Sequence, residues 1–132
     1  MQRRTPFGIA AMIAVLASPV LLAHHSNAMY ERDKVVEVAG TIREFQWTNP
    51  HTFIELTVDG PGGASNYSIE GPTPGVLRSQ GWKFNTLKAG DKVTVKVHPL
   101  KSGRVGGALV SVTKDGVTIN AGSATQTDKG YQ

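Results

Sequence analysis

The sequence predicts an all-β fold, a small OB-like Greek-key barrel of five to six strands with one short helix. Three observations support this prediction. Short runs of alternating apolar and polar residues recur along the chain, separated by glycine, proline, asparagine and aspartate turn signals. One helix signal lies between the third and fourth runs, where the OB-fold often carries its helix. The first run is long and changes parity midway, which is typical of a bent first strand. A small antiparallel sandwich is the alternative architecture.

The first strand is expected over residues 34–47. Its apolar residues keep one parity as far as Ile42 and take the other parity from Phe45 onward. A β-bulge near Arg43 would produce this switch, and Gly40 would ease the bend. The remaining strands are expected over residues 51–58, 65–70, 92–98, 108–113 and 117–120.

Turn and cap signals connect these strands. The glycine-rich run 59–63 predicts a hairpin turn between the second and third strands. Thr73 is a natural helix N-cap, Pro74 suits the first helical position, and Gly81 suits the residue after the helix. A short helix is therefore expected just after Thr73.

The N-terminal stretch predicts an export signal that is removed. Arg3 and Arg4 make a basic start, and residues 7–22 are mostly apolar. Cleavage is expected after Ala23, with Ala28 as the competing position, by either the general secretory or the twin-arginine route. The mature protein is then periplasmic or secreted, with no membrane span left after cleavage.

The chain is accordingly expected to divide into four parts. These are a signal peptide at 1–23, an N-terminal arm at 24–33, an OB-like barrel domain at 34–120, and a disordered tail at 121–132. One domain of this size can bury a modest core.

Composition excludes several classes of function. The chain has no cysteine, so thiolate metal sites, iron–sulfur clusters, c-type haem attachment and cysteine nucleophiles are excluded. The formal net charge of +4 includes Arg3 and Arg4, which leave with the signal. The basic balance therefore does not indicate a nucleic-acid partner, and export also argues against one.

The four histidines are His24, His25, His51 and His98, and they are candidates for a metal site. If His24 becomes the first residue, its free amine and its ring can chelate one ion together, with His25 as a substitute. His51 and His98 lie at strand ends that an OB-like barrel would bring to one end. Neutral imidazole suits copper and zinc, and copper(II) prefers nitrogen-rich square geometries. The alternative is that these histidines are ordinary surface residues.

Trp47, Asn49 and Phe53 are candidates for a ligand-binding face, because OB-folds bind oligosaccharides and oligonucleotides beside the second strand. The second hypothesis is therefore a non-catalytic interaction module that binds a partner protein, a glycan or another small ligand in the periplasm. No enzyme is expected, since the serines lack a placed base and orienting group.

Several short motifs lie along the chain: Ala23-His24-His25-Ser26, Gly40, Trp47-Thr48-Asn49-Pro50-His51, Gly81-Trp82, Gly90-Asp91 and His98-Pro99. In these motifs the chain resembles a family of small exported bacterial proteins that is catalogued only as a domain of unknown function. The resemblance implies an exported β-barrel and cleavage just before His24. It implies no activity and no site residue.

Overall fold

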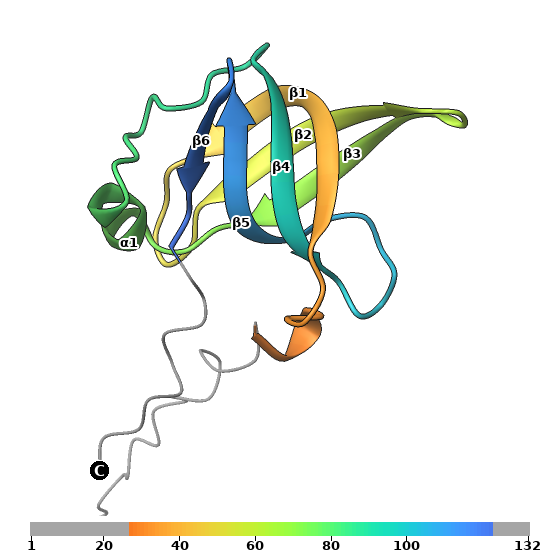
Figure 1. The fold of residues 1–132 in the computed structure, drawn as a ribbon, viewed down its shortest axis with the longest axis horizontal. Coiled ribbons are helices and arrows are strands. Elements are labelled where there is room, and N and C mark those ends of the chain that lie inside the picture. The colour runs from red at the N-terminus through yellow and green to blue at the C-terminus, as the bar shows by residue number, and fades with distance from the viewer. Residues whose placement is uncertain (1–26, 123–132) are drawn as a thin grey trace, which may run out of the picture.

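Six strands form a single sheet that curls and closes on itself (Figure 1). In the computed structural model, which describes residues 27–122, the strands are β1 (Val36–Gln46), β2 (Phe53–Gly60), β3 (Gly63–Glu70), β4 (Lys92–Pro99), β5 (Gly107–Lys114) and β6 (Val117–Asn120). A short helix, α1 (Pro74–Ser79), joins β3 to β4, and a 3-10 turn, η1 (Asn27–Met29), precedes β1. The predicted all-β barrel with one short helix is confirmed, with β6 as the extra strand.

Some expected features lie outside the described residues. These are the signal peptide at 1–23, His24, His25, and residues 123–132 of the expected tail. Ala121 is described, and it is buried with its N–H donating to the carbonyl of Val110 at 2.9 Å. The barrel therefore extends one residue further than expected. Among residues 27–122, no helix is long and apolar enough to cross a membrane.

The barrel closes where β3 meets β5. Neighbouring strands follow the order β3-β2-β1-β4-β5-β6 and pair antiparallel. The closing pair is parallel, with Ile69 opposite Gly107 and Glu70 opposite Ala108. Because this contact involves only two residues of β3, the rest of the β2–β3 hairpin extends away from the barrel (Figure 1).

The strand β1 pairs with two neighbours along different parts of its length. Residues 36–41 pair with β4, whereas residues 41–46 pair with β2. The register with β2 shifts between Ile42 and Glu44, so the predicted bulge near Arg43 is confirmed. The bend lets one strand serve two walls of the barrel, and its two ends consequently lie at opposite ends of the molecule.

Alternation along the strands fills the interior as the sequence pattern predicts. The buried core includes Ile42, Ile54, Leu56, Ile69, Val93, Val95, Val97, Leu109 and Val112. One end of the barrel is covered by Leu77 of α1 and by Trp82, whose indole N–H donates to the carbonyl of Asn120 at 2.7 Å. The helix starts as expected, since the side chain of Thr73 accepts the N–H of Val76.

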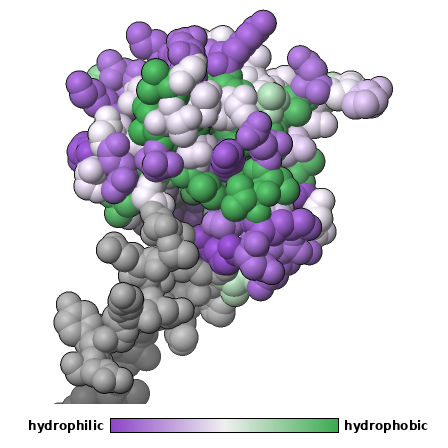
Figure 2. Space-filling model, in the orientation of Figure 1, coloured by the Kyte–Doolittle hydropathy of each residue, from purple (hydrophilic) through white to green (hydrophobic). Residues whose placement is uncertain are grey.

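The observed strand ends differ from the expected ones by no more than two residues. At the β2–β3 hairpin, pairing continues to Gly60 and Gly63, so that only Pro61 and Gly62 remain in the turn. On the outside, Figure 2 shows hydrophilic and neutral residues over most of one face, with a hydrophobic patch in its lower half.

Candidate functional site

The segment before β1 docks onto the barrel beside the loop that follows β4. Tyr30 forms a β-bridge with Leu100, the N–H of Glu31 donates to the carbonyl of Pro99 at 2.9 Å, and the N–H of Lys101 donates to Met29 at 2.9 Å. Tyr30 is only 5% exposed. The described part of the expected arm is therefore a docked segment with one buried aromatic residue.

The phenol of Tyr30 donates a hydrogen bond of 2.6 Å to Oε2 of Glu70, the last residue of β3. The main chain of Tyr30 lies beside the residue that follows β4, and its phenol reaches the end of β3. The start of β5 pairs with both of these strands, and its outward-facing Ala108 is 8% exposed. Burial and the bond to Glu70 raise the pKa of the Tyr30 phenol, which therefore stays a protonated donor at neutral pH.

The ring of His51 lies against the other oxygen of the same carboxylate. Its Nδ1 is 3.2 Å from Oε1 of Glu70 and 3.2 Å from the carbonyl oxygen of Gly71. Both neighbours are acceptors, so Nδ1 must carry a hydrogen. The neutral ring then keeps its lone pair on Nε2, and the side chain is 38% exposed. This arrangement is the one that metal-binding histidines adopt, with one nitrogen held by a carboxylate or carbonyl and the other free.

Local backbone contacts position His51. The connection from β1 to β2 contains a cis peptide between Asn49 and Pro50, and the hydroxyl of Thr48 donates to the carbonyl of His51 at 2.9 Å. Thr52, which is 1% exposed, ties this connection to the segment after β3 through its hydroxyl and the carbonyl of Pro72 at 2.9 Å. Hydrogen bonds from Thr48 and Thr52 therefore restrain the backbone on both sides of His51.

His98 lies on the outer face of β4, and its Nδ1 is 2.8 Å from the carbonyl of Lys34. This contact also places a hydrogen on Nδ1. Across the sheet, His98 lies opposite Ala108, which lies opposite Glu70. His98 is therefore two strand spacings, about 10 Å, from the residue that His51 contacts.

The structure brings His51 to Glu70 and keeps His98 two strands away from that carboxylate. The sequence placed the two histidines together across β1, but they lie beyond opposite ends of that strand. Their neighbourhoods meet through the β3–β5 closure instead. Within residues 27–122, no group of three or more histidine, aspartate or glutamate side chains is arranged to hold a metal.

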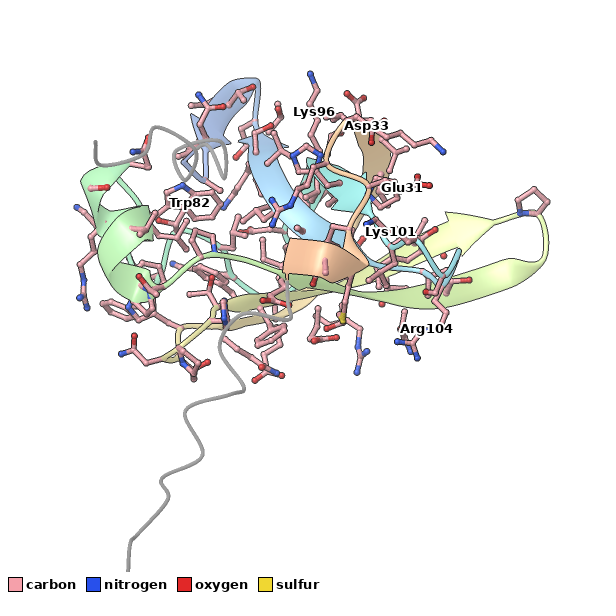
Figure 3. The ribbon with its side chains drawn as sticks, turned by 90° about the horizontal axis from the view of Figure 1, so that it is seen from below. Glu31, Asp33, Trp82, Lys96, Lys101 and Arg104 are labelled. Carbon is pink, nitrogen blue, oxygen red and sulfur yellow. The ribbon has the colours of Figure 1, made fainter. Side chains whose placement is uncertain are left out.

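The predicted ligand-face residues lie in three different settings. Trp47 packs edge to face on Phe45, with a centroid distance of 5.6 Å, and the guanidinium of Arg78 lies 5.5 Å from its ring. Phe45 in turn contacts Trp82, at the opposite side from Lys101 and Arg104 (Figure 3). Trp47 thus lies on the helix side of the barrel, away from Lys101 and Arg104.

Of the other two, Asn49 is exposed in the β1–β2 connection, whereas Phe53 is half-buried and lies opposite Glu70. Phe53 therefore borders the Tyr30–Glu70–His51 group. Asn49 lies two residues before His51 in the chain.

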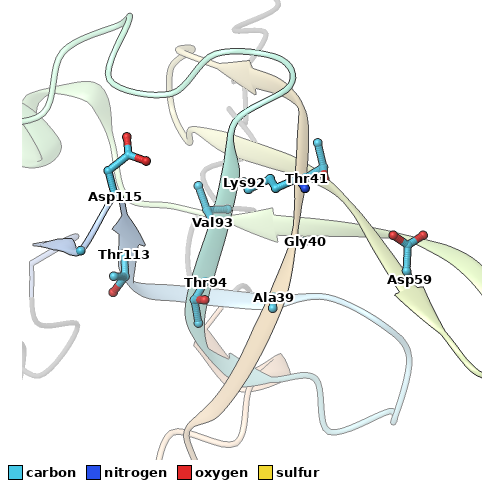
Figure 4. A pocket seen from close by; sticks show the side chains of 10 residues that line it. Ala39, Gly40, Thr41, Asp59, Lys92, Val93, Thr94, Thr113 and Asp115 are labelled. Carbon is cyan, nitrogen blue, oxygen red and sulfur yellow. The ribbon is translucent and has the colours of Figure 1, made fainter.

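A separate open groove of about 480 Å³ lies over β1, β4 and β5. Its lining includes Thr41, Thr94, Thr113, Lys92 and Asp115 (Figure 4). The described residues that line it include no histidine and no aromatic residue, so they offer neither imidazole ligands nor a stacking surface. The Tyr30–Glu70–His51 group is consequently the stronger candidate site.

Sequence reasoning found His51 and missed its two partners. Tyr30 is the single tyrosine, phenylalanine or tryptophan in the expected arm 24–33, and that isolation was the available signal. Glu70 resembled any outward-facing carboxylate at a strand end. Its role depends on which strand lies beside β3, and the pattern of one strand does not contain that information.

Comparison with protein-family models identifies the family of the chain. No curated protein matches the chain. A family model described as "Family of unknown function (DUF6152)" matches residues 12–110. The match covers the Trp47–His51 connection, Glu70 and most of the barrel. The chain therefore belongs to this family of unknown function, as the resemblance in its sequence motifs implied.

Proposed function

We propose that the protein is an exported binding module that holds one metal ion, copper(II) in preference to zinc(II), at His51. One observation carries this proposal. Nδ1 of His51 lies between two acceptor oxygens, so that a neutral ring presents Nε2 as a ready ligand. The same carboxylate that holds the ring also holds the N-terminal arm through Tyr30.

The arm would supply the remaining nitrogen ligands. His24 precedes Tyr30 by six residues, so at about 3.3 Å per residue it has a reach of roughly 20 Å. That reach is sufficient to return to His51 from an anchored Tyr30. The amine and ring of a first-residue His24 form a chelate, and His25 is the substitute. Amine and imidazole nitrogens together favour copper(II).

His98 is the weaker ligand candidate in this proposal. Its Nε2 is also free to bind, because Nδ1 is occupied by the carbonyl of Lys34. Its position two strands from Glu70 argues against binding of the same ion by His98 and His51. The position of His98 allows it to bind a metal ion only separately from His51 and more weakly.

The test is a calorimetric titration of copper(II), with zinc(II) in parallel, on protein purified from the periplasm. Intact mass should first establish a chain that starts at His24. We expect His51→Ala to weaken copper binding by about ten- to a hundredfold. One extra residue before His24 should weaken it sharply, because the amine becomes an amide. His98→Ala is the matched control and should change the affinity little.

Two outcomes would overturn the proposal. The first is a mature chain that starts at Met29, which would lack His24 and His25. The second is unchanged copper binding in both the His51→Ala protein and the extended protein.

The second candidate function is an interaction module, and the exposed apolar side chains favour it. The exposed large apolar side chains are Met29, Val35, Val76, Phe84, Val105 and Val117. One face of the molecule carries a hydrophobic patch bordered by hydrophilic residues (Figure 2). Such a surface suits a partner protein. This function would be preferred if the wild-type protein binds no metal.

A further inference from the structure

We propose that Tyr30 is a positioning residue, which holds the N-terminal arm on the barrel and orients His51 through the shared carboxylate of Glu70. The inference concerns the arm and the ring themselves, so most of it stands without a metal. Only its last step, the effect on metal affinity, rests on the proposed function.

Tyr30 provides the main anchor of the arm. Its neighbour Met29 is 46% exposed and Val35 is 51% exposed, whereas Tyr30 is 5% exposed. The backbone contributes two hydrogen bonds between arm and barrel, from Glu31 to Pro99 and from Lys101 to Met29. Two backbone bonds alone are a weak attachment, because each contributes little net free energy in water. The buried ring and its charged acceptor therefore dominate the docking.

The carboxylate of Glu70 has one oxygen for each partner. Oε2 accepts the phenol of Tyr30 at 2.6 Å, and Oε1 lies 3.2 Å from Nδ1 of His51. The short phenol bond is charge-assisted and restrains the carboxylate plane. Restraining that plane also fixes the oxygen that faces His51. Loss of the phenol would leave the carboxylate free to turn toward water, with His51 held by the carbonyl of Gly71 alone.

Docking of the arm and ligation at His51 are then coupled. Under the proposed function, docking at Tyr30 raises the effective concentration of the arm's ligand at His51, whereas a released arm must be ordered when the metal binds. By linkage, metal bound to both arm and barrel should in turn hold the arm more firmly. The arm would thus complete the site only while Tyr30 is docked.

The experiment compares metal-free wild type with Tyr30→Phe, which keeps the ring and removes the hydroxyl. Tyr67→Phe is the matched control, because it removes a phenol elsewhere on β3. Hydrogen exchange is followed at the amides of Glu31 and Lys101, which bridge arm and barrel. In Tyr30→Phe these two amides should exchange about ten- to a hundredfold faster, the effect of losing a hydrogen bond to a charged group. Amides in the β2–β3 ladder should not change.

A second metal-free measurement reads the ring directly. Nitrogen chemical shifts of His51 should report a hydrogen on Nδ1 in wild type and in Tyr67→Phe, and a mixture of tautomers in Tyr30→Phe. Unchanged arm exchange together with an unchanged His51 ring in Tyr30→Phe would overturn the inference. Equal acceleration of every amide would overturn it as well, since Tyr30 would then act only on global stability.

Copper titration of the same proteins separates this inference from the proposed function. If wild type binds no copper, the proposed function fails while the exchange and ring measurements still decide the role of Tyr30. If wild type binds copper and Tyr30→Phe binds it five- to tenfold more weakly, the coupling is supported. Equal copper affinity in wild type and Tyr30→Phe would refute the coupling and leave the metal site intact.

Discussion

Replacing Gly40 with alanine should destabilise the protein because β1 and β2 approach closely at the bend. A Cβ at this position would lie 2.5 Å from the carbonyl oxygen of Thr57 and 2.8 Å from Cγ of Leu56. The first neighbour is backbone and the second belongs to a fully buried side chain, so neither can move away easily. Overpacking of this kind costs about 1–3 kcal/mol.

The same substitution at Gly62 is the control. No atom lies within 4 Å of a Cβ built there, and its φ is not in the left-handed region. Alanine at a compatible glycine position stabilises a protein by about 0.4–1 kcal/mol, because the unfolded chain loses freedom. The same gain partly offsets the clash at Gly40, which leaves a net loss of roughly 1–2 kcal/mol for Gly40→Ala.

The assay is a denaturant titration followed by tryptophan fluorescence, with thermal melting as a second measurement. Gly40→Ala should lower the midpoint at an unchanged slope, which indicates a change in stability without a change in the surface exposed on unfolding. The melting temperature should fall by about 4–8 °C per kcal/mol for a domain of this size. Gly62→Ala should have the opposite sign or no effect. Equal midpoints for the two variants would refute the close approach of β1 and β2.

Two further predictions test the strand register and the turn before β4. Val95→Ala should cost about 1–3 kcal/mol, since Val95 is fully buried, whereas exposed Lys96→Ala should lie within about 0.5 kcal/mol of neutral; comparable losses in urea would mean a wrong register. The hydrogen bond from Lys114 at 2.6 Å and the N–H of Lys88 lower the pKa of Asp91 from 3.8. A carboxyl group whose pKa is lower in the folded than in the unfolded state stabilises the fold at pH values above the unfolded-state pKa. This stabilisation is lost as the pH falls through the folded-state pKa, so the stability difference between wild type and Asp91→Asn should shrink below about pH 4. A difference from wild type that is constant between pH 7 and pH 2 would contradict this assignment.

The barrel was predictable because its signals are local. Alternation over a few residues decides which side chains of a strand face inward, so Val95 and Leu56 could be assigned to the core from the sequence. The parity switch between Ile42 and Phe45 likewise identified the bulge, since one extra residue reverses the facing of everything after it. Thr73 marked the helix start because its side chain bonds a backbone N–H three residues on.

The candidate site was predictable only in part. His51 was identified because an imidazole beside an Asn-Pro turn is visible in the chain itself. His51 and His98 were expected at one end of the barrel because β2 and β4 both flank β1. In the structure they lie beyond opposite ends of the bent β1. Tyr30 and Glu70 were not assigned to the site, because their contact joins residues forty positions apart.

The sequence by itself determined the all-β class, the element order, the bulge, and the absence of any cysteine-based chemistry. Each of these depends on residue identity or on spacing within one element. The tertiary structure alone decided that the carboxylate of Glu70 lies between the phenol of Tyr30 and the ring of His51. The physical reason is the parallel closure of β3 on β5, which sets Glu70 opposite Ala108 and places the end of β3 beside the docked arm. Such a contact joins residues far apart in the chain, so the alternation of residues within each strand cannot predict it.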